Sequence, residues 1–246
     1  MKISLIALAA FAGTIGASAS AQTYDAFTSF TGAPQPSGNG NFIYGEADPA
    51  NPGSSGTLFT ANTNCFIAGS TCLQRAPNFD VPGVTKSTVA SFQYGSVNVP
   101  TDRLLAHPGN DTLQTFVAFV APTAGIYTYK ATFNIQDVRP TGVGINLIRT
   151  TSGGLPLIFT PLSVINGQVP SYSTMGQFTL GASEAFGFGI DNQGNFSNDS
   201  TGINFTVFAG VPEPTTWGLL ILGFGVIGGS MRRRTKLTAI GLPAAA

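Results

Sequence analysis

The stretch Ile126-Tyr-Thr-Tyr-Lys-Ala-Thr-Phe-Asn-Ile135 indicates the fold class of this chain. Its odd-numbered positions, from Tyr127 to Ile135, are apolar, and its even-numbered positions, from Thr128 to Asn134, are polar. Successive side chains of a β-strand point to opposite faces of a sheet, so this alternation predicts a strand that is buried on one face only.

Segments on both sides of this stretch also read as strands, separated by clusters of Gly, Pro, Asn and Ser. The expected strands are 24–30, 41–44, 57–60, 114–120, 143–149, 155–160, 176–180, 184–190 and 203–208. Many short strands divided by turns are typical of a β-sandwich. We therefore predict an all-β, antiparallel, two-sheet sandwich of the jelly-roll type.

Composition supports this fold class and argues against a nucleic-acid partner. Charged residues make up 9% of the 246 residues, against 11% aromatic, with 31 Gly and 16 Pro. Between Gln22 and Gly210 lie six basic and ten acidic residues, a net charge of about −4. Nucleic-acid binding needs clustered Lys and Arg, and in this part of the sequence none cluster.

The N-terminus has the pattern of a secretory signal peptide. Lys2 precedes an apolar run from Ile3 to Ile15, and small residues at A-x-A spacing end at Ala21. This order predicts an exported protein with an N-terminal signal helix that is cleaved between Ala21 and Gln22.

The C-terminus has three parts in order. Val211-Pro-Glu-Pro214 is followed by Trp217, then by 14 uncharged residues (218–231), then by Arg232, Arg233 and Arg234. As a helix this run would measure about 21 Å, which is short for a hydrocarbon core of about 30 Å. The Arg cluster favours the cytoplasmic side. We expect a short, glycine-rich transmembrane helix that a processing enzyme removes.

This tail resembles the PEP-CTERM sorting signal of Gram-negative bacteria, also catalogued as the ice-binding protein C-terminal domain. The resemblance implies that exosortase recognises Pro212, Glu213 and Pro214, that Trp217 lies at the interface and that Arg232–Arg234 stop transfer. It also implies an association with exopolysaccharide or biofilm matrix. The chain departs from the pattern by continuing through 235–246, and an ordinary C-terminal membrane anchor stays the alternative.

A weaker resemblance covers roughly residues 104–207. Leu105-Ala-His-Pro-Gly109, Phe119-Val-Ala-Pro-Thr-Ala-Gly-Ile-Tyr127, Thr141-Gly-Val-Gly-Ile145 and Gly189-Ile-Asp-Asn-Gln-Gly-Asn195 are similar to carbohydrate-binding-module-type sandwiches. These motifs are mainly turn sequences, so the resemblance implies a fold more than a ligand.

The two cysteines, Cys65 and Cys72, enclose six residues. In an exported protein an even number of cysteines favours a disulfide. A Cys/His metal cage or a Cys–His nucleophile would need more ligands than His107, which is the one histidine of the sequence.

The carboxylates could serve calcium binding or glycoside hydrolysis. Asp191 and Asp199 bracket an oxygen-rich segment that suits Ca²⁺, although Phe196 and Gly202 break the EF-hand pattern and an ordinary turn accounts for the same residues. Glycoside hydrolysis needs two opposed carboxyl groups, and no pair in the sequence is set in opposition. We expect no enzymatic activity and no cofactor other than a possible Ca²⁺.

The sequence thus predicts a signal peptide (1–21), a loop-rich part with a disulfide (22–86), the sandwich core (87–210), the sorting signal (211–234) and a cytoplasmic tail (235–246). Its partners would be exosortase, the membrane before processing, and exopolysaccharide. The predicted function is that of a non-catalytic surface or extracellular-matrix protein, exported through the inner membrane of a Gram-negative bacterium. The alternatives are a secreted carbohydrate-active enzyme and a calcium-stabilised carbohydrate-binding module.

Overall fold

The computed structural model describes residues 21–51, 56–62, 65, 67–75, 82–150, 157–210, 223–225 and 227. One compact unit spans Ala21–Gly210. Its first part contains α1 (Ala26–Ser29) and the strands β1 (Thr23–Asp25), β2 (Phe42–Ala47), β3 (Thr57–Leu58), β4 (Thr60–Asn62), β5 (Ser70–Gln74) and β6 (Gly83–Ser87). Its remaining strands are β7 (Phe92–Tyr94), β8 (Val97–Val99), β9 (Leu104–His107), β10 (Gln114–Val120), β11 (Gly125–Ile135), β12 (Val143–Thr150), β13 (Leu157–Ile165), β14 (Ser171–Leu180), β15 (Ala185–Asp191) and β16 (Thr201–Ala209).

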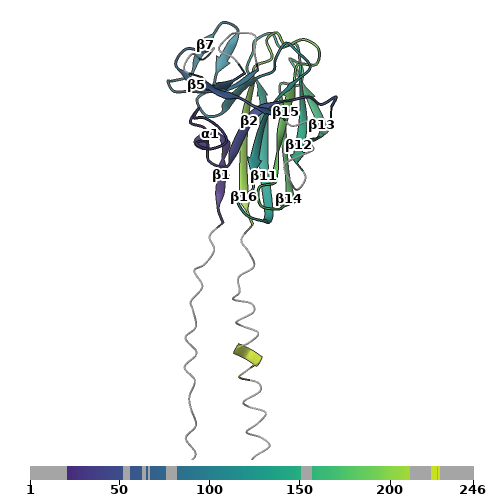
Figure 1. Cartoon of the computed structure of the whole chain (residues 1–246). Coiled ribbons are helices and arrows are strands. Elements are labelled where there is room, and N and C mark those ends of the chain that lie inside the picture. Colours follow the sequence, from purple (N-terminus) through teal and green to yellow (C-terminus); the bar gives the residue numbers. More distant parts are fainter. Residues whose placement is uncertain are drawn as a thin grey trace, which may run out of the picture. The chain divides into compact units, whose positions relative to one another are not determined.

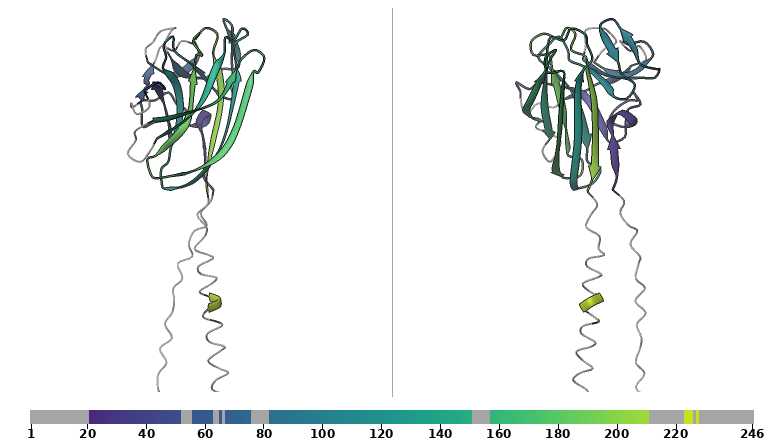
Figure 2. Two further views of the ribbon diagram at one scale, coloured as in Figure 1. Left: turned by 90° about the vertical axis from the view of Figure 1, so that its right-hand side faces the viewer. Right: turned by 180° about the vertical axis from the view of Figure 1, so that it is seen from behind.

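The strands form two main sheets that face each other in this unit (Figure 1, Figure 2). Among the described residues, one sheet has the order β14-β11-β16-β9-β6-β5-β4, with β1 also paired to β16. The other has the order β13-β12-β15-β10-β2-β3, and β7 and β8 form a separate pair. The strand pairs are antiparallel, from β1–β16 to β7–β8. The predicted all-β antiparallel sandwich is confirmed.

The alternating stretch forms β11, a long inner strand of the first sheet. Tyr127, Tyr129, Ala131 and Phe133 are buried, whereas Thr128 and Lys130 are exposed and Thr132 and Asn134 are partly exposed. β11 pairs with β14 on one side and β16 on the other. The one-faced burial inferred from the alternation therefore holds.

Aromatic side chains fill the space between the sheets. Phe42, Phe119, Phe186 and Phe188 come from the β2-β10-β15 layer and contact Phe205 or one another, with ring centroids 5.1–6.0 Å apart in tilted or edge-on geometry. Such arrangements are the favourable ones for aromatic pairs. Because both sheets contribute rings, each strand of the central part is fixed against the opposite layer.

One expected strand is partly wrong. Residues 24–30 form β1 and then the short helix α1, because the Asp25 side chain accepts a hydrogen bond from Thr28 N at 2.8 Å and caps the helix. The same carboxylate accepts a hydrogen bond from Thr206 Oγ1 on β16 at 2.9 Å. A capping contact therefore stabilises a helix where the sequence predicts a strand.

Other strands are longer than expected, β13 and β14 among them. The sequence indicates 155–160 and 176–180, whereas β13 continues to Ile165 and β14 starts at Ser171. Pro161 lies within β13, where it is tolerated because β13 is an edge strand beside a register shift at Ile145/Asn146. Polar, exposed residues alternate along β14, which pairs over its whole length with β11.

The loop-rich part contributes to both sheets. β2 pairs with β10, and β6 pairs with β9, so residues before and after position 86 share one hydrogen-bonded framework. The predicted signal helix falls on residues 1–20, which lie outside the described residues.

Candidate functional site

The two ends of the sandwich unit lie side by side on neighbouring strands. β1 pairs with the end of β16 in the register Thr23↔Phe208, and Ala209 N donates to Gln22 O at 2.8 Å. Gly210 N donates to Ile126 O at 2.8 Å. Figure 1 shows the start of β1 and the end of β16 at the same end of the unit. The predicted cleavage point, between Ala21 and Gln22, therefore directly precedes the first strand of the fold, and the tail follows its last.

The residues of the expected sorting signal fall mostly outside the described part of the chain. These are Pro212, Glu213, Pro214, Trp217, Arg232, Arg233 and Arg234. Within the intervening run, residues 223–225 and 227 are helical and exposed. No helix among the described residues combines the length and the apolar character needed to cross a membrane.

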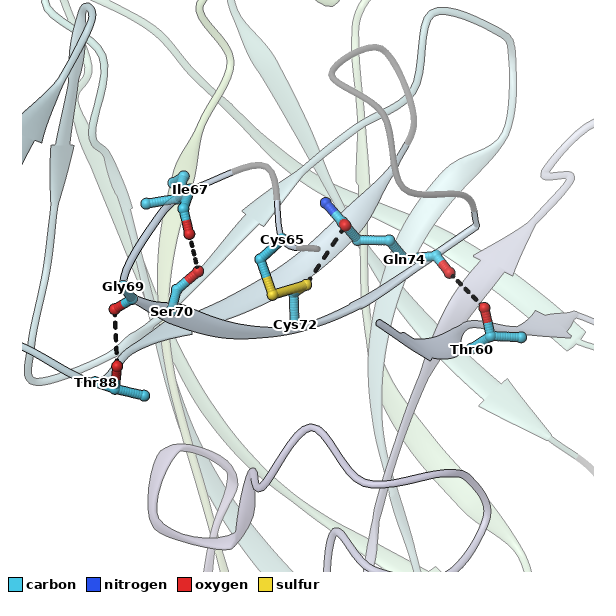
Figure 3. Close-up of a disulfide and its surroundings, with 8 residues drawn as sticks. All are labelled: Thr60, Cys65, Ile67, Gly69, Ser70, Cys72, Gln74 and Thr88. Carbon is cyan, nitrogen blue, oxygen red and sulfur yellow. Dashed lines mark hydrogen bonds between the residues drawn. A yellow bond between two sulfur atoms is a disulfide. The ribbon is translucent and has the colours of Figure 1, made fainter. Parts of the chain in front are cut away.

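A disulfide joins Cys65 and Cys72, whose Cα atoms are 5.6 Å apart (Figure 3). Cys72 lies in β5, where it is buried and pairs with Thr85 of β6. The enclosed turn is held further by Ser70 Oγ, which donates to Ile67 O, and by Thr88 Oγ1, which donates to Gly69 O at 2.9 Å. The bridge therefore fixes a short loop onto the edge region of the larger sheet.

The structure holds Asp191 and Asp199 in two different hydrogen-bond networks. Asp191 ends β15, where its Oδ2 accepts from Asn146 Nδ2 at 2.8 Å and its Oδ1 accepts from Gln193 N at 3.0 Å. Asp199 precedes β16 and its Oδ1 accepts from Thr141 and Gly142. Both oxygens of Asp191 accept hydrogen bonds, and their donors differ from the donors to Asp199.

Asp199 is the more unusual of the two carboxylates. Its side chain is fully buried, and burial raises its pKa to about 6, an effect that the bonds from Thr141 and Gly142 counteract in part. Neighbouring Asp137 is also buried and its charge raises the pKa of Asp199 further. Among the described residues, no group of three or more His, Cys, Asp or Glu side chains is arranged to hold a metal ion.

Other carboxylates of the sandwich have structural partners. Glu46 is bound to Arg75, whose Nη1 also contacts Asp111 Oδ2 at 2.7 Å. Glu184 Oε2 accepts from Gly181 N at 2.8 Å. No sequence pattern predicts the Arg75–Glu46–Asp111 cluster, because its members are separated by up to 65 positions and only the folded chain joins them.

A family model decides what the tail is. The model for the PEP-CTERM protein-sorting motif matches residues 210–234. The chain carries a PEP-CTERM sorting motif. The PEP-CTERM motif thus begins at Gly210, the residue that is hydrogen-bonded to Ile126 at the end of the sandwich. This motif indicates an exported protein of a Gram-negative bacterium that exosortase sorts to the surface.

Other comparisons concern the body of this PEP-CTERM-bearing chain. No curated protein matches it. Carbohydrate-binding modules are among the solved structures that it resembles, in line with the weaker sequence resemblance. A Podospora anserina GH26-CBM35 β-(1,4)-mannanase is 18% identical, covers 52% of this chain and 25% of its own, and has a TM-score of 0.28.

Two structures from Clostridium thermocellum xylanase 10B are also similar. The CBM22-1–GH10 modules are 8% identical, cover 46% of this chain and 26% of their own, and have a TM-score of 0.26. The C-terminal family 22 carbohydrate-binding module is 6% identical, covers 78% and 95%, and has a TM-score of 0.32. The chain spans about a quarter of the length of the mannanase and of the CBM22-1–GH10 modules.

Proposed function

We propose that this protein is a non-catalytic surface or extracellular-matrix protein. Exosortase would recognise its VPEP signal and release or attach the sandwich. The observation that carries the proposal is the PEP-CTERM motif over residues 210–234, directly after the last strand of the sandwich. Before processing, the apolar run 218–231 holds the chain in the membrane, and the Arg cluster keeps its end on the cytoplasmic side.

The position of the motif supports this proposal. β16 is paired over its length with β11, and its end also pairs with β1. Among the described residues, the bond from Gly210 N to Ile126 O is the last one along the chain that ties it to the sandwich. A processing enzyme that cuts beyond Gly210 would therefore leave every described strand of the sandwich in place.

The roles of the carboxylates support a non-catalytic protein. Glu46 and Asp111 share Arg75, Glu184 closes a turn, and Asp25 caps α1. A glycosidase needs one carboxyl group free to donate a proton and another free to act as base or nucleophile. Carboxylates engaged in ion pairs and caps serve the fold instead.

The same proposal includes contact with exopolysaccharide on the outer face of the larger sheet. Thr128, Lys130 and Thr132 of β11 point to this face, next to Gln177, Met175 and Ser173 of β14. Thr132 Oγ1 lies 3.1 Å from Ser173 Oγ. Hydroxyl and amide groups on an exposed sheet provide donors and acceptors for sugar hydroxyls.

Mass spectrometry of the mature protein from its native host tests the sorting proposal. We expect the wild-type protein to lack the residues beyond the VPEP region. The variant Glu213→Ala should retain the tail, because the charged residue between the two prolines is removed. The variant Glu184→Ala, which deletes a carboxylate from the sandwich, should be processed like the wild type. A wild-type protein that still ends at Ala246 would show that the tail is an ordinary anchor.

A further inference from the structure

The Thr141 hydroxyl lies at the centre of a group of oxygen atoms. Its Oγ1 is 2.8 Å from Asn195 O, 2.8 Å from Ser197 O and 2.7 Å from Asp199 Oδ1. A threonine hydroxyl carries a single proton, and both carbonyl oxygens and an ionised carboxylate can only accept. At most one of the three contacts is therefore an ordinary hydrogen bond, and the other two bring oxygen lone pairs together without a proton between them.

The Asp199 carboxylate adds a second, independent observation. Its side chain is fully buried, and among the described residues its Oδ2 has no hydrogen-bond partner. Its Oδ1 already accepts from Thr141 N and Gly142 N at 3.2 and 3.1 Å. A buried charged oxygen without a partner is costly, so it calls for a compensating group.

Further negative charge lies beside this cluster. Oδ2 of buried Asp137 accepts a hydrogen bond from Ser200 N at 2.8 Å. Ser96 Oγ lies 2.6 Å from Asp137 Oδ1 and 3.0 Å from Asn198 Oδ1. In the described part of the chain, the ion pairs are formed by Arg75 and Arg103, and neither of these involves Asp137 or Asp199. Among the described residues, neither of these two neighbouring buried carboxylates is therefore in an ion pair with Lys or Arg.

We propose that a calcium ion binds here, coordinated by Asn195 O, Ser197 O, the Asp199 carboxylate and Thr141 Oγ1. Calcium takes six to eight hard oxygen ligands at about 2.3–2.6 Å, often in a pentagonal bipyramid, in which adjacent equatorial ligands are about 2.8 Å apart. The separations of Asn195 O and Ser197 O from Thr141 Oγ1 have this spacing. Thr141, Asn195 and Ser197 are exposed, so the ion can enter from solvent and water can complete its coordination.

The ion would join the two sheets at the end of the sandwich where β12 and β16 begin. Thr141 and Gly142 lead into β12 of one sheet, and Asp199 leads into β16 of the other. β16 starts beside this site at Thr201 and ends at Ala209, next to the motif. A bound ion therefore orders the loop 195–199 and fixes the start of the strand that leads to the tail.

Calorimetric titration of the exported protein, freed of metal with EDTA, tests the site. We expect one Ca²⁺ per chain, weaker binding of Mg²⁺, and a melting temperature that rises by about 5–10 °C when Ca²⁺ exceeds its Kd 100-fold. Absence of calcium binding by the wild type, or an equal effect of Mg²⁺, would overturn the proposal.

Four variants locate the site. Asp199→Asn and Thr141→Val should lose calcium binding and the calcium-dependent rise in melting temperature, whereas Thr141→Ser and Asp191→Asn should keep both. Because Asp199→Asn removes an uncompensated buried charge, its melting temperature in EDTA should equal or exceed that of the wild type, which separates loss of binding from loss of folding. Retained binding in Asp199→Asn together with loss in Asp191→Asn would place the ion elsewhere and contradict the proposal.

Discussion

His107 illustrates how single residues serve the fold. It ends β9, its ring is 6.4 Å from that of Phe196, and its Nδ1 lies 2.6 Å from Pro108 O. Because a carbonyl oxygen can only accept, Nδ1 carries the proton and Nε2 is the nitrogen that titrates. Burial lowers the pKa of His107, partly offset by this hydrogen bond and by the charge of Asp137.

This lowered pKa predicts a loss of stability in mild acid. The unfolded chain takes up a proton on His107 near pH 6.5, while the folded chain takes it up only at lower pH. The contribution is therefore fully present above about pH 6.5 and declines as the pH falls below it. Urea unfolding of the wild type and of His107→Gln at pH 7.5 and 5.0 measures it. We expect the wild type to lose more stability than the variant, and equal losses would contradict this role.

The residues that sequence patterns identified well are those whose roles are local. Asp25, by contrast, lies in an expected strand. Its carboxylate in fact caps a helix and also binds Thr206, 181 positions away, and no local pattern predicts either contact. The sequence around Thr141 predicts only a turn, whereas its contact with Asp199 joins residues 58 positions apart. Such contacts leave no mark on the neighbouring sequence.

At the scale of elements, the disulfide links Cys65 covalently to Cys72 of β5. It closes a loop between residues separated by seven positions, next to the β5–β6 pairing. Cross-linking a loop of this size reduces the entropy of the unfolded chain. The cysteine pair could be read from the sequence, but the attachment of this loop to β6 through Gly69 and Thr88 could not.

We expect the Cys65→Ala/Cys72→Ala double variant to lose about 2.5 kcal/mol of unfolding free energy, from the loop-closure relation. Urea unfolding under non-reducing conditions measures the difference. Adding a reductant should bring the wild type close to the double variant and leave the double variant unchanged. If the two proteins were equally stable without reductant, the loop would be held by β5 and its hydrogen bonds alone.

At the scale of the whole sandwich unit, the first and last strands pair with each other. Tyr24 of β1 is 8% exposed and its ring lies 4.9 Å from that of Phe119, so β1 contributes to the core as well as to the sheet. The fold is complete only when the chain has been made as far as Ala209, and the sorting motif begins at the next residue, Gly210.

This closure predicts a large effect of a substitution three residues after the expected signal cleavage. Tyr24→Ala should cost about 3 kcal/mol of unfolding free energy, because it leaves a cavity against Phe119. Tyr24→Phe keeps the ring and should stay within about 1 kcal/mol of the wild type. Chemical denaturation measures both. A change below about 1 kcal/mol for Tyr24→Ala would mean that β1 is dispensable.

The sequence by itself determined the strand-forming stretches, the predicted signal at its start and the sorting motif at its end, because alternation, apolar runs and short motifs are properties of neighbouring residues. Only the tertiary structure decided that β1 pairs with β16, that Arg75 joins Glu46 to Asp111, and that oxygen atoms converge on Thr141. These arrangements depend on how two sheets bury their apolar faces against each other. That packing brings together residues far apart in the chain, and no local pattern records it.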